Sequence, residues 1–296
     1  MIDCGTNSIR LLVADVTVRD DGSRWLRDVR REMRIVRLGQ GVDATGRLAP
    51  EAIERTRVAL AAYTAMLVRT GAERVRMVAT SATRDAANTD EFVAMVRSTL
   101  GTDPEVISGD EEARLSFIGA VGDCDPTDGP FLVVDVGGGS TEIAVGTTHA
   151  GVSWWASFRL GSGQLAEEHL RSDPPTPTEL AIMRAHAEEV FDAIDVPRPD
   201  TAVAVGGSAA SLRRLVGGTV GADSMRRALG VLCEGPADAV AQRYELDPER
   251  VRLMPAGLVI LAAATGCLGC ELTIGNGGLR EGVLLELASD IIGGGP

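Results

Sequence analysis

The sequence contains one short pattern twice, about 130 residues apart, and this repeat constrains the fold more than any other feature. Each copy has an aspartate at the end of a predicted strand, a turn rich in glycine and hydroxyl side chains, and a second predicted strand. The first copy spans residues 3–10 (DCGTNSIR) and the second spans residues 135–142 (DVGGGSTE). A chain of 296 residues is long enough for two domains, so the repeat predicts a duplicated α/β protein with a cleft between its halves.

Hydrophobic periodicity predicts alternating strands and helices along both halves. Strands are expected over residues 9–18, 25–37, 74–80, 105–107, 131–135, 142–146, 152–159, 201–205 and 271–274. Helices are expected over residues 50–68, 89–100, 110–121, 162–170, 177–193, 223–233, 236–245, 254–268 and 278–289, with another opening at Gly206. The turn-rich segment 124–130 predicts an N-terminal domain over 1–122 and a C-terminal domain over 123–296, with the final helix packing back on the former.

Charge and cysteine usage narrow the class of protein. The formal net charge of −13 argues against broad binding to nucleic acid or to a membrane surface, although it allows local binding of a polyanion. An odd number of cysteines without a predicted secretory signal indicates a cytoplasmic protein. Cys267 and Cys270 form one C-x-x-C pair in an apolar helical run, where we expect buried small residues rather than a zinc or redox site.

The two loops have the composition of anion-binding sites. Backbone N–H groups of a tight turn can converge on one point, and hydroxyl groups add further donors. The candidate phosphate-binding residues of the two loops are Gly5, Thr6, Asn7, Ser8, Gly137, Gly138, Gly139, Ser140 and Thr141. Gly207 and Ser208 open a helix after a predicted strand, where they either bind a phosphate at the helix N-terminus or only form a turn.

Acidic residues accompany these loops. An aspartate beside a phosphate is unfavourable unless a hard cation such as Mg²⁺ or Mn²⁺ lies between them, which makes Asp135 and Glu142 candidate metal ligands. Residues 108–114 (SGDEEAR) place three carboxylates at a helix N-terminus, and capping by Asp110 is the simplest interpretation. Arg84 follows a predicted strand and either reaches a bound phosphate or lies in solvent.

Six segments together resemble the exopolyphosphatase/guanosine pentaphosphate phosphohydrolase (Ppx/GppA) family. They are DCGTNS with Arg10, ATSATR at 79–84, ISGDEEARL at 107–115, VDVGGGSTE at 134–142, AVGGSAASL at 204–212 and GGLREGVL at 277–284. The segments occur in the family's order and span nearly the whole chain. The resemblance implies the duplicated fold of actin, sugar kinases and Hsp70 ATPases (ASKHA), a substrate in the interdomain cleft and a homodimer.

The resemblance also implies that Glu112 is the catalytic base and that Arg10 and Arg84 neutralise bound phosphates. The function it implies is exopolyphosphatase activity, in which Glu112 activates water to hydrolyse the terminal phosphoanhydride of polyphosphate. Longer family members carry an additional helical domain that holds long polyphosphate, so a preference for short chains is expected here. Only two residues precede Asp3, so we expect a very short first strand or a start outside this sequence.

Three other functions fit parts of the pattern. Hydrolysis of guanosine pentaphosphate (pppGpp) uses the same terminal phosphoanhydride, and the motifs do not separate it from polyphosphate hydrolysis. An ATP-dependent kinase or ATPase of the same superfamily would need an adenosine pocket, for which no further motif is present. A non-catalytic sensor of polyphosphate or pppGpp would have no need of Glu112 or Glu142, and both are present.

Overall fold

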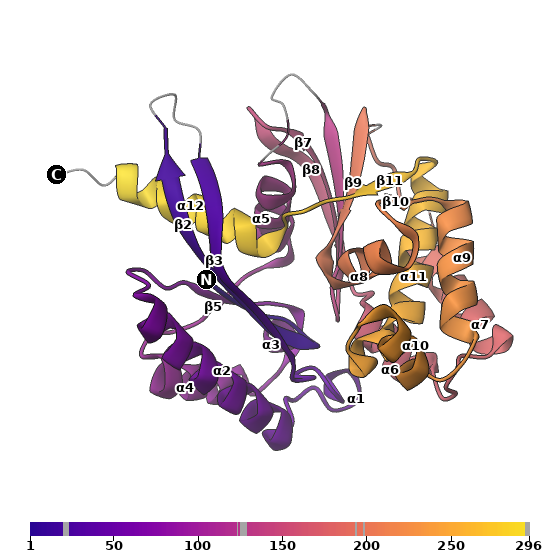
Figure 1. Ribbon diagram of the computed structural model, residues 1–296, viewed down its shortest axis with the longest axis horizontal. Coiled ribbons are helices and arrows are strands. Elements are labelled where there is room, and N and C mark those ends of the chain that lie inside the picture. The colour runs from indigo at the N-terminus through magenta and orange to yellow at the C-terminus, as the bar shows by residue number, and fades with distance from the viewer. Residues whose placement is uncertain (20–23, 123, 125–128, 193, 198, 294–296) are drawn as a thin grey trace.

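The structure is a computed structural model that describes residues 1–19, 24–122, 124, 129–192, 194–197 and 199–293. These residues form two β-sheets with helices on their outer faces and two further helices between the sheets (Figure 1). Most of the segment 124–130, predicted to separate the halves, lies outside the described residues, so the domain boundary at 122/123 stays a prediction.

The first sheet has the strand order β3-β2-β1-β4-β5. Its elements are β1 (Ile2–Cys4), β2 (Ser8–Val18), β3 (Arg24–Ile35), α1 (Val42–Thr45), α2 (Pro50–Thr70), β4 (Met77–Ala79), α3 (Ser81–Asp85), α4 (Thr89–Leu100) and β5 (Glu105–Val106). Tyr63 of α2 is fully buried, and its hydroxyl donates to the Ile9 carbonyl over 3.0 Å. This bond fixes α2 against β2 directly beyond the first loop.

The second sheet repeats that order as β8-β7-β6-β9-β11, with β10 added at its edge. Its elements are β6 (Phe131–Val136), β7 (Thr141–Thr147), β8 (Gly151–Phe158), α6 (Ser162–His169), α7 (Pro177–Phe191), β9 (Thr201–Val205), α8 (Gly206–Val216), β10 (Thr219–Val220), α9 (Ala222–Cys233), α10 (Ala237–Tyr244), α11 (Pro248–Leu268) and β11 (Leu272–Ile274). In both sheets the first two strands are antiparallel and the first and fourth are parallel. The predicted duplicated α/β fold is therefore confirmed.

Two helices, α5 (Gly109–Val121) and α12 (Leu279–Gly293), cross between the sheets (Figure 1). One side of α5 packs on the second sheet through Phe117 and Val121. Its other side joins α12 in a cluster against the first sheet. A side chain at Gly119 would collide with the backbone of α12, so the close crossing requires glycine there.

Helix α11 is the central helix of the second core. By length and composition it is the one helix among the described residues that could cross a membrane, but it packs against α6, α7 and α10. Its apolar composition is accounted for by this burial. The predicted start at residue 254 is wrong, because Asp247 caps the helix and Pro248 begins it.

Other details differ from the sequence-based expectation. The short α1 and β10 were not predicted, since neither is long enough to show a period. Cys267 is exposed and Cys270 is half-buried, because they lie where α11 leaves the core, and neither forms a disulfide among the described residues. Asp110 does not cap α5: Ser108 is the N-cap residue and accepts from the Glu111 N–H.

Candidate functional site

The first loop joins β1 to β2 as a tight hairpin. The Gly5 N–H donates to the Ser8 carbonyl over 3.0 Å. After β3 the chain returns to this loop, where the Gly39 N–H donates to the Thr6 carbonyl over 2.8 Å. The loop is therefore held on both sides by backbone hydrogen bonds.

The second loop joins β6 to β7 in the same way. The Gly137 N–H donates to the Ser140 carbonyl over 2.9 Å. The start of α6 then covers this loop: the Ser162 N–H donates to the Gly137 carbonyl and the Gly163 N–H to the Gly138 carbonyl, each over 2.9 Å. The two phosphate loops predicted from the sequence thus have the same backbone construction.

The loops of the two halves touch. A Cβ atom added at Gly139 would lie 2.5 Å from Thr6 Oγ1 and 2.8 Å from Ser81 Oγ, so only glycine allows this approach. At Gly138 the added atom would lie 3.0 Å from the Asn7 nitrogen. The contact brings segments more than a hundred residues apart together at one point between the sheets.

A cavity of about 350 Å³ extends from this contact between the two halves. The predicted site residues that line it are Gly5, Thr6, Asn7, Ser8, Arg10, Glu112, Asp135, Gly137, Gly138, Gly139, Ser140, Gly207 and Ser208. Thr6 Oγ1 is buried and has no hydrogen-bond partner among the described residues. A buried hydroxyl normally has a hydrogen-bond partner, so the unpaired hydroxyl of Thr6 supports the binding of a ligand at the loops.

Three predicted residues do not line this cavity. Thr141 Oγ1 donates to the Leu160 carbonyl over 2.6 Å, which uses the hydroxyl within the second half. Arg84 donates to the Ile107 carbonyl over 2.8 Å and pairs with Glu112 at 3.3 Å. Phosphate binding by Thr141 and Arg84 stays a prediction, and Arg84 in this structure lies against the predicted base. The third residue, Glu142, is buried.

Buried carboxylates gather at this cavity: Glu112 and Asp135 line it, and Glu142 pairs with Asp135 in the β6–β7 ladder without lining it. Asp135 accepts from Ser116 Oγ over 2.6 Å, and Glu142 accepts from Ser157 Oγ over 2.8 Å. Burial, with a smaller effect of Asp135, raises the pKa of Glu142 to about 8. Burial also raises the pKa of Glu112 well above its usual range, and the charges of Glu142 and Asp135 raise it further.

This group of buried carboxylates fits a hard divalent cation. Asp135 and Glu112 face the cavity, and Glu142 lies opposite Asp135 in the β6–β7 ladder. Magnesium prefers oxygen ligands, and a cation would offset the repulsion that raises these pKa values. These residues could therefore hold a divalent cation, and Mg²⁺ or Mn²⁺ binding stays a prediction.

Three arginines that line this cavity were not among the predicted residues: Arg31, Arg250 and Arg280. Arg250 lies near the start of α11, and Arg280 lies in the first turn of α12. A Cβ atom added at Gly207 would lie 2.6 Å from Arg10 Nη2 and 2.8 Å from Arg250 Nη2, so these guanidinium groups converge on the start of α8. Burial, with the charge of Arg10, lowers the pKa of Arg250 to about 10. Buried cations near one another favour an anionic ligand.

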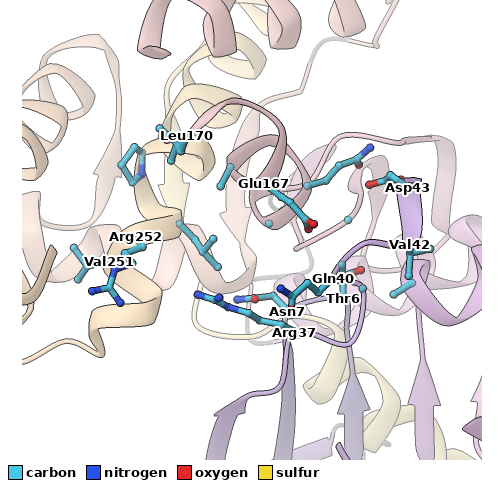
Figure 2. A pocket seen from close by; sticks show the side chains of 18 of the residues that line it. Thr6, Asn7, Arg37, Gln40, Val42, Asp43, Glu167, Leu170, Val251 and Arg252 are labelled. Carbon is cyan, nitrogen blue, oxygen red and sulfur yellow. The ribbon is translucent and has the colours of Figure 1, made fainter. Parts of the chain in front are cut away.

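A second cavity, of about 360 Å³, lies between the halves and shares part of the loop contact (Figure 2). Of the predicted phosphate-binding residues it contains only Thr6, Asn7 and Gly139. Its wall also carries apolar side chains, including Val42 and Val251 (Figure 2). Phosphates are better matched by the first cavity, which holds most of both loops, the start of α8 and Glu112.

Comparisons with known proteins agree with this geometry. The chain is 55% identical over 193 residues to exopolyphosphatase 2 of Mycobacterium tuberculosis, a match that covers 64% of this chain and 60% of that protein. It is 32% identical over 303 residues to a guanosine-5'-triphosphate,3'-diphosphate pyrophosphatase of Aeromonas hydrophila, covering 97% of this chain and 58% of that protein. The chain thus spans about 60% of the length of these two relatives.

Solved structures match over nearly the full chain. A crystal structure of an exopolyphosphatase-like protein has 31% identity and a TM-score of 0.86, with 98% of each chain covered. The Ppx/GppA family member of Aquifex aeolicus has 30% identity and a TM-score of 0.78, covering 98% of this chain and 97% of that one. The sequence model described as the Ppx/GppA phosphatase family matches residues 16–290. The chain therefore belongs to the Ppx/GppA phosphatase family.

Proposed function

We propose that this protein is an exopolyphosphatase that removes the terminal phosphate of inorganic polyphosphate in the cavity between its two loops. The observation that carries the proposal is the position of Glu112. Its carboxyl group is buried, and it lines the same cavity as both glycine-rich loops. A base held beside the terminal phosphates is what hydrolysis requires and what binding alone does not.

The residues of the cavity have different roles in this reaction. Backbone N–H groups of the two loops align the terminal phosphates, and Arg10 and Arg250 offset their charge. Glu112 orients a water molecule and takes its proton as the water oxygen attacks the terminal phosphorus. The bridging P–O bond breaks, which releases orthophosphate and a chain one phosphate shorter. Burial raises the pKa of Glu112, which makes its carboxylate a stronger proton acceptor than that of an ordinary glutamate.

Asp135 and Glu142 would hold the divalent cation, Mg²⁺ or Mn²⁺. When bound, the cation supplies charge neutralisation at the phosphoryl oxygens. Asp135 is oriented by Ser116 and Glu142 by Ser157, so both carboxylates have fixed positions without a ligand. The odd number of cysteines supports a reducing, cytoplasmic location, and a homodimer is proposed from the family resemblance.

The test compares Glu112→Gln with Glu111→Gln. Glu111 is the neighbouring carboxylate, which pairs with Arg114 outside the cavity. Phosphate release from short and long polyphosphates with Mg²⁺ or Mn²⁺ should fall about 10³-fold or more in Glu112→Gln and change little in Glu111→Gln. Polyphosphate binding should persist in both variants. Near-normal turnover in Glu112→Gln would contradict the proposed base.

A second candidate is hydrolysis of pppGpp at the same site. It is favoured by the relative named as a guanosine-5'-triphosphate,3'-diphosphate pyrophosphatase, which aligns with 97% of this chain. Assays of wild-type protein with polyphosphate, pppGpp, ATP and ADP side by side distinguish the candidates. Release from pppGpp alone would replace the main proposal. Binding of both without turnover would indicate a sensor.

A further inference from the structure

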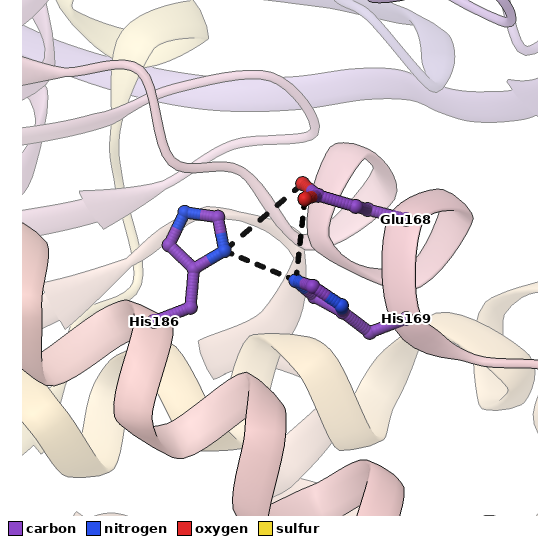
Figure 3. Close-up of side chains that lie close together, drawn as sticks. All are labelled: Glu168, His169 and His186. Atoms are coloured by element: carbon purple, nitrogen blue, oxygen red, sulfur yellow. Dashed lines mark hydrogen bonds and ion pairs between the residues drawn. The ribbon is translucent and has the colours of Figure 1, made fainter.

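A cluster of two histidines and a glutamate lies away from the phosphate loops. Glu168 and His169 are the last residues of α6, and His186 lies in α7 (Figure 3). His169 Nε2 lies 3.0 Å from His186 Nδ1 and 3.6 Å from one carboxylate oxygen of Glu168. The other carboxylate oxygen lies 4.0 Å from His186 Nδ1. Three ligand atoms from two helices thus face one point, as Figure 3 shows.

The spacing of these atoms matches a coordination site. Ligand atoms about 2.0–2.2 Å from a tetrahedral zinc ion are separated from one another by roughly 3.3–3.6 Å. The separation of the two imidazole nitrogens is 3.0 Å, and the two Glu168 oxygens lie 3.6 Å from His169 Nε2 and 4.0 Å from His186 Nδ1, each within about half an ångström of that range. A hydrogen bond between the imidazoles accounts for the shortest separation, and the Glu168 carboxylate lies within ion-pair distance of both nitrogens, where its oxygens could also serve as metal ligands.

The donor types select the class of metal. Two imidazole nitrogens and one carboxylate suit zinc and similar divalent transition metals, whereas magnesium prefers oxygen ligands alone. Glu168 is exposed and both histidines are partly exposed, so an ion and a water molecule as fourth ligand can reach the site. None of the three residues lines the cavity that contains Glu112.

We propose that Glu168, His169 and His186 form a site for a zinc-class divalent ion that joins α6 to α7. The position gives the ion a structural consequence. The first residues of α6 donate hydrogen bonds to the second phosphate loop, at Gly137 and Gly138. An ion at the other end of this short helix would fix α6 to α7 and thereby restrain the support of that loop.

The test measures binding of Zn²⁺ and Co²⁺ to the whole chain by titration calorimetry and visible absorption, with excess Mg²⁺ present to occupy the carboxylate site. Wild-type protein should bind one ion with micromolar affinity, and bound Co²⁺ should give d–d bands without thiolate charge transfer. His169→Ala and His186→Ala should each weaken binding roughly tenfold or more. His149→Ala, which alters the third histidine of the sequence outside this cluster, should leave it unchanged.

Several results would overturn the site. The first is an unchanged affinity in both histidine variants, and the second is no binding by the wild-type protein up to millimolar Zn²⁺. The third is loss of binding in a Cys267→Ser/Cys270→Ser double variant, because the ion would then be bound by the thiols. Thermal unfolding without metal checks that each variant is folded. If an alanine variant does not fold, the corresponding glutamine variant, His169→Gln or His186→Gln, is used in its place. Because the readouts are metal binding and spectra, failure of the exopolyphosphatase proposal would leave this test intact.

Discussion

The two phosphate loops have the same backbone hydrogen-bonding pattern, but their last residues carry opposite charges. In each, an aspartate begins an eight-residue hairpin, and its partner in the antiparallel ladder ends it. Asp3 lies opposite Arg10, whereas Asp135 lies opposite Glu142. The first loop thus ends in a cation that lines the cavity, whereas the second ends in a carboxylate next to the cavity-lining Asp135. The two hairpins therefore have the same ladder pairing, and the last residue decides whether the pair contains a cation or a second carboxylate. In the proposed function this difference gives the first loop the substrate anion and the second loop the metal cation.

The largest effect on activity should come from replacing a glycine at which the two loops touch, rather than one that does not contact the other loop. A Cβ atom at Gly139 would meet Thr6 and Ser81, whereas at Gly5 the nearest atom would be 3.5 Å away, an ordinary contact. Gly139→Ala should therefore lower kcat/KM for polyphosphate about 100-fold by displacing one loop from the other. Gly5→Ala should stay within about threefold. Equal losses in the two variants, measured by steady-state phosphate release, would refute this asymmetry.

Arg10 tests the anion-binding half of the comparison. Removing a charged hydrogen-bond donor costs about 1.5–3 kcal/mol, so Arg10→Gln should raise KM for polyphosphate roughly 10- to 100-fold and change kcat less. Arg27→Gln makes the same charge change on the exposed part of β3 and serves as the control. A drop in kcat at unchanged KM would show that Arg10 acts only in the transition state.

Glu142 tests the metal-binding half through pH. Its pKa is about 8 in the folded protein against 4.5 for an ordinary glutamate, so the folded state retains a proton that the unfolded state has lost. The stability from this proton is complete below pH 4.5 and is lost as the pH rises through 8. Relative to Glu142→Gln, metal-free wild type should lose at least about 1 kcal/mol, or roughly 3 °C in Tm, between pH 5 and pH 9.

Added Mg²⁺ should recover much of this loss in wild type and less in Glu142→Gln, because a cation stabilises the ionised carboxylate. Glu188→Gln, on the exposed face of α7, is the matched control and should follow the wild-type curve. Parallel melting curves for wild type and Glu142→Gln across this pH range would mean that Glu142 ionises normally.

Local signals predicted most of the fold and both loops. Each loop lies within eight consecutive residues, and the long helices and strands show clear periods. Helix α11 was predicted six residues too short because Pro255 and the charged residues before it obscured its first turns; the Asp-Pro pair at 247–248 was the signal that marks its start. Likewise Ser108, rather than Asp110, caps α5.

The site residues that the sequence did not predict are brought together by tertiary contacts. Arg250 reaches the start of α8 from a helix that begins 41 residues later, counting from Gly207 to Pro248, and nothing in its local sequence indicates that approach. Arg280 lay within a segment that resembled the family, but its spacing alone assigned it no role. His169 and His186 are 17 residues apart in different helices, and only the packing of α6 on α7 brings their nitrogens together.

The crossing of α5 and α12 has a consequence for how the protein can move. Glu112 lies in the first turn of α5, and that helix is packed on the second sheet while α12 secures it to the first. Gly119 and Gly282 let the two helices approach until their backbones touch. If the halves open to admit substrate, this contact between the two helices is where they would stay joined. Glu112, which α5 carries, would then keep its position on the second sheet while the two loops separate.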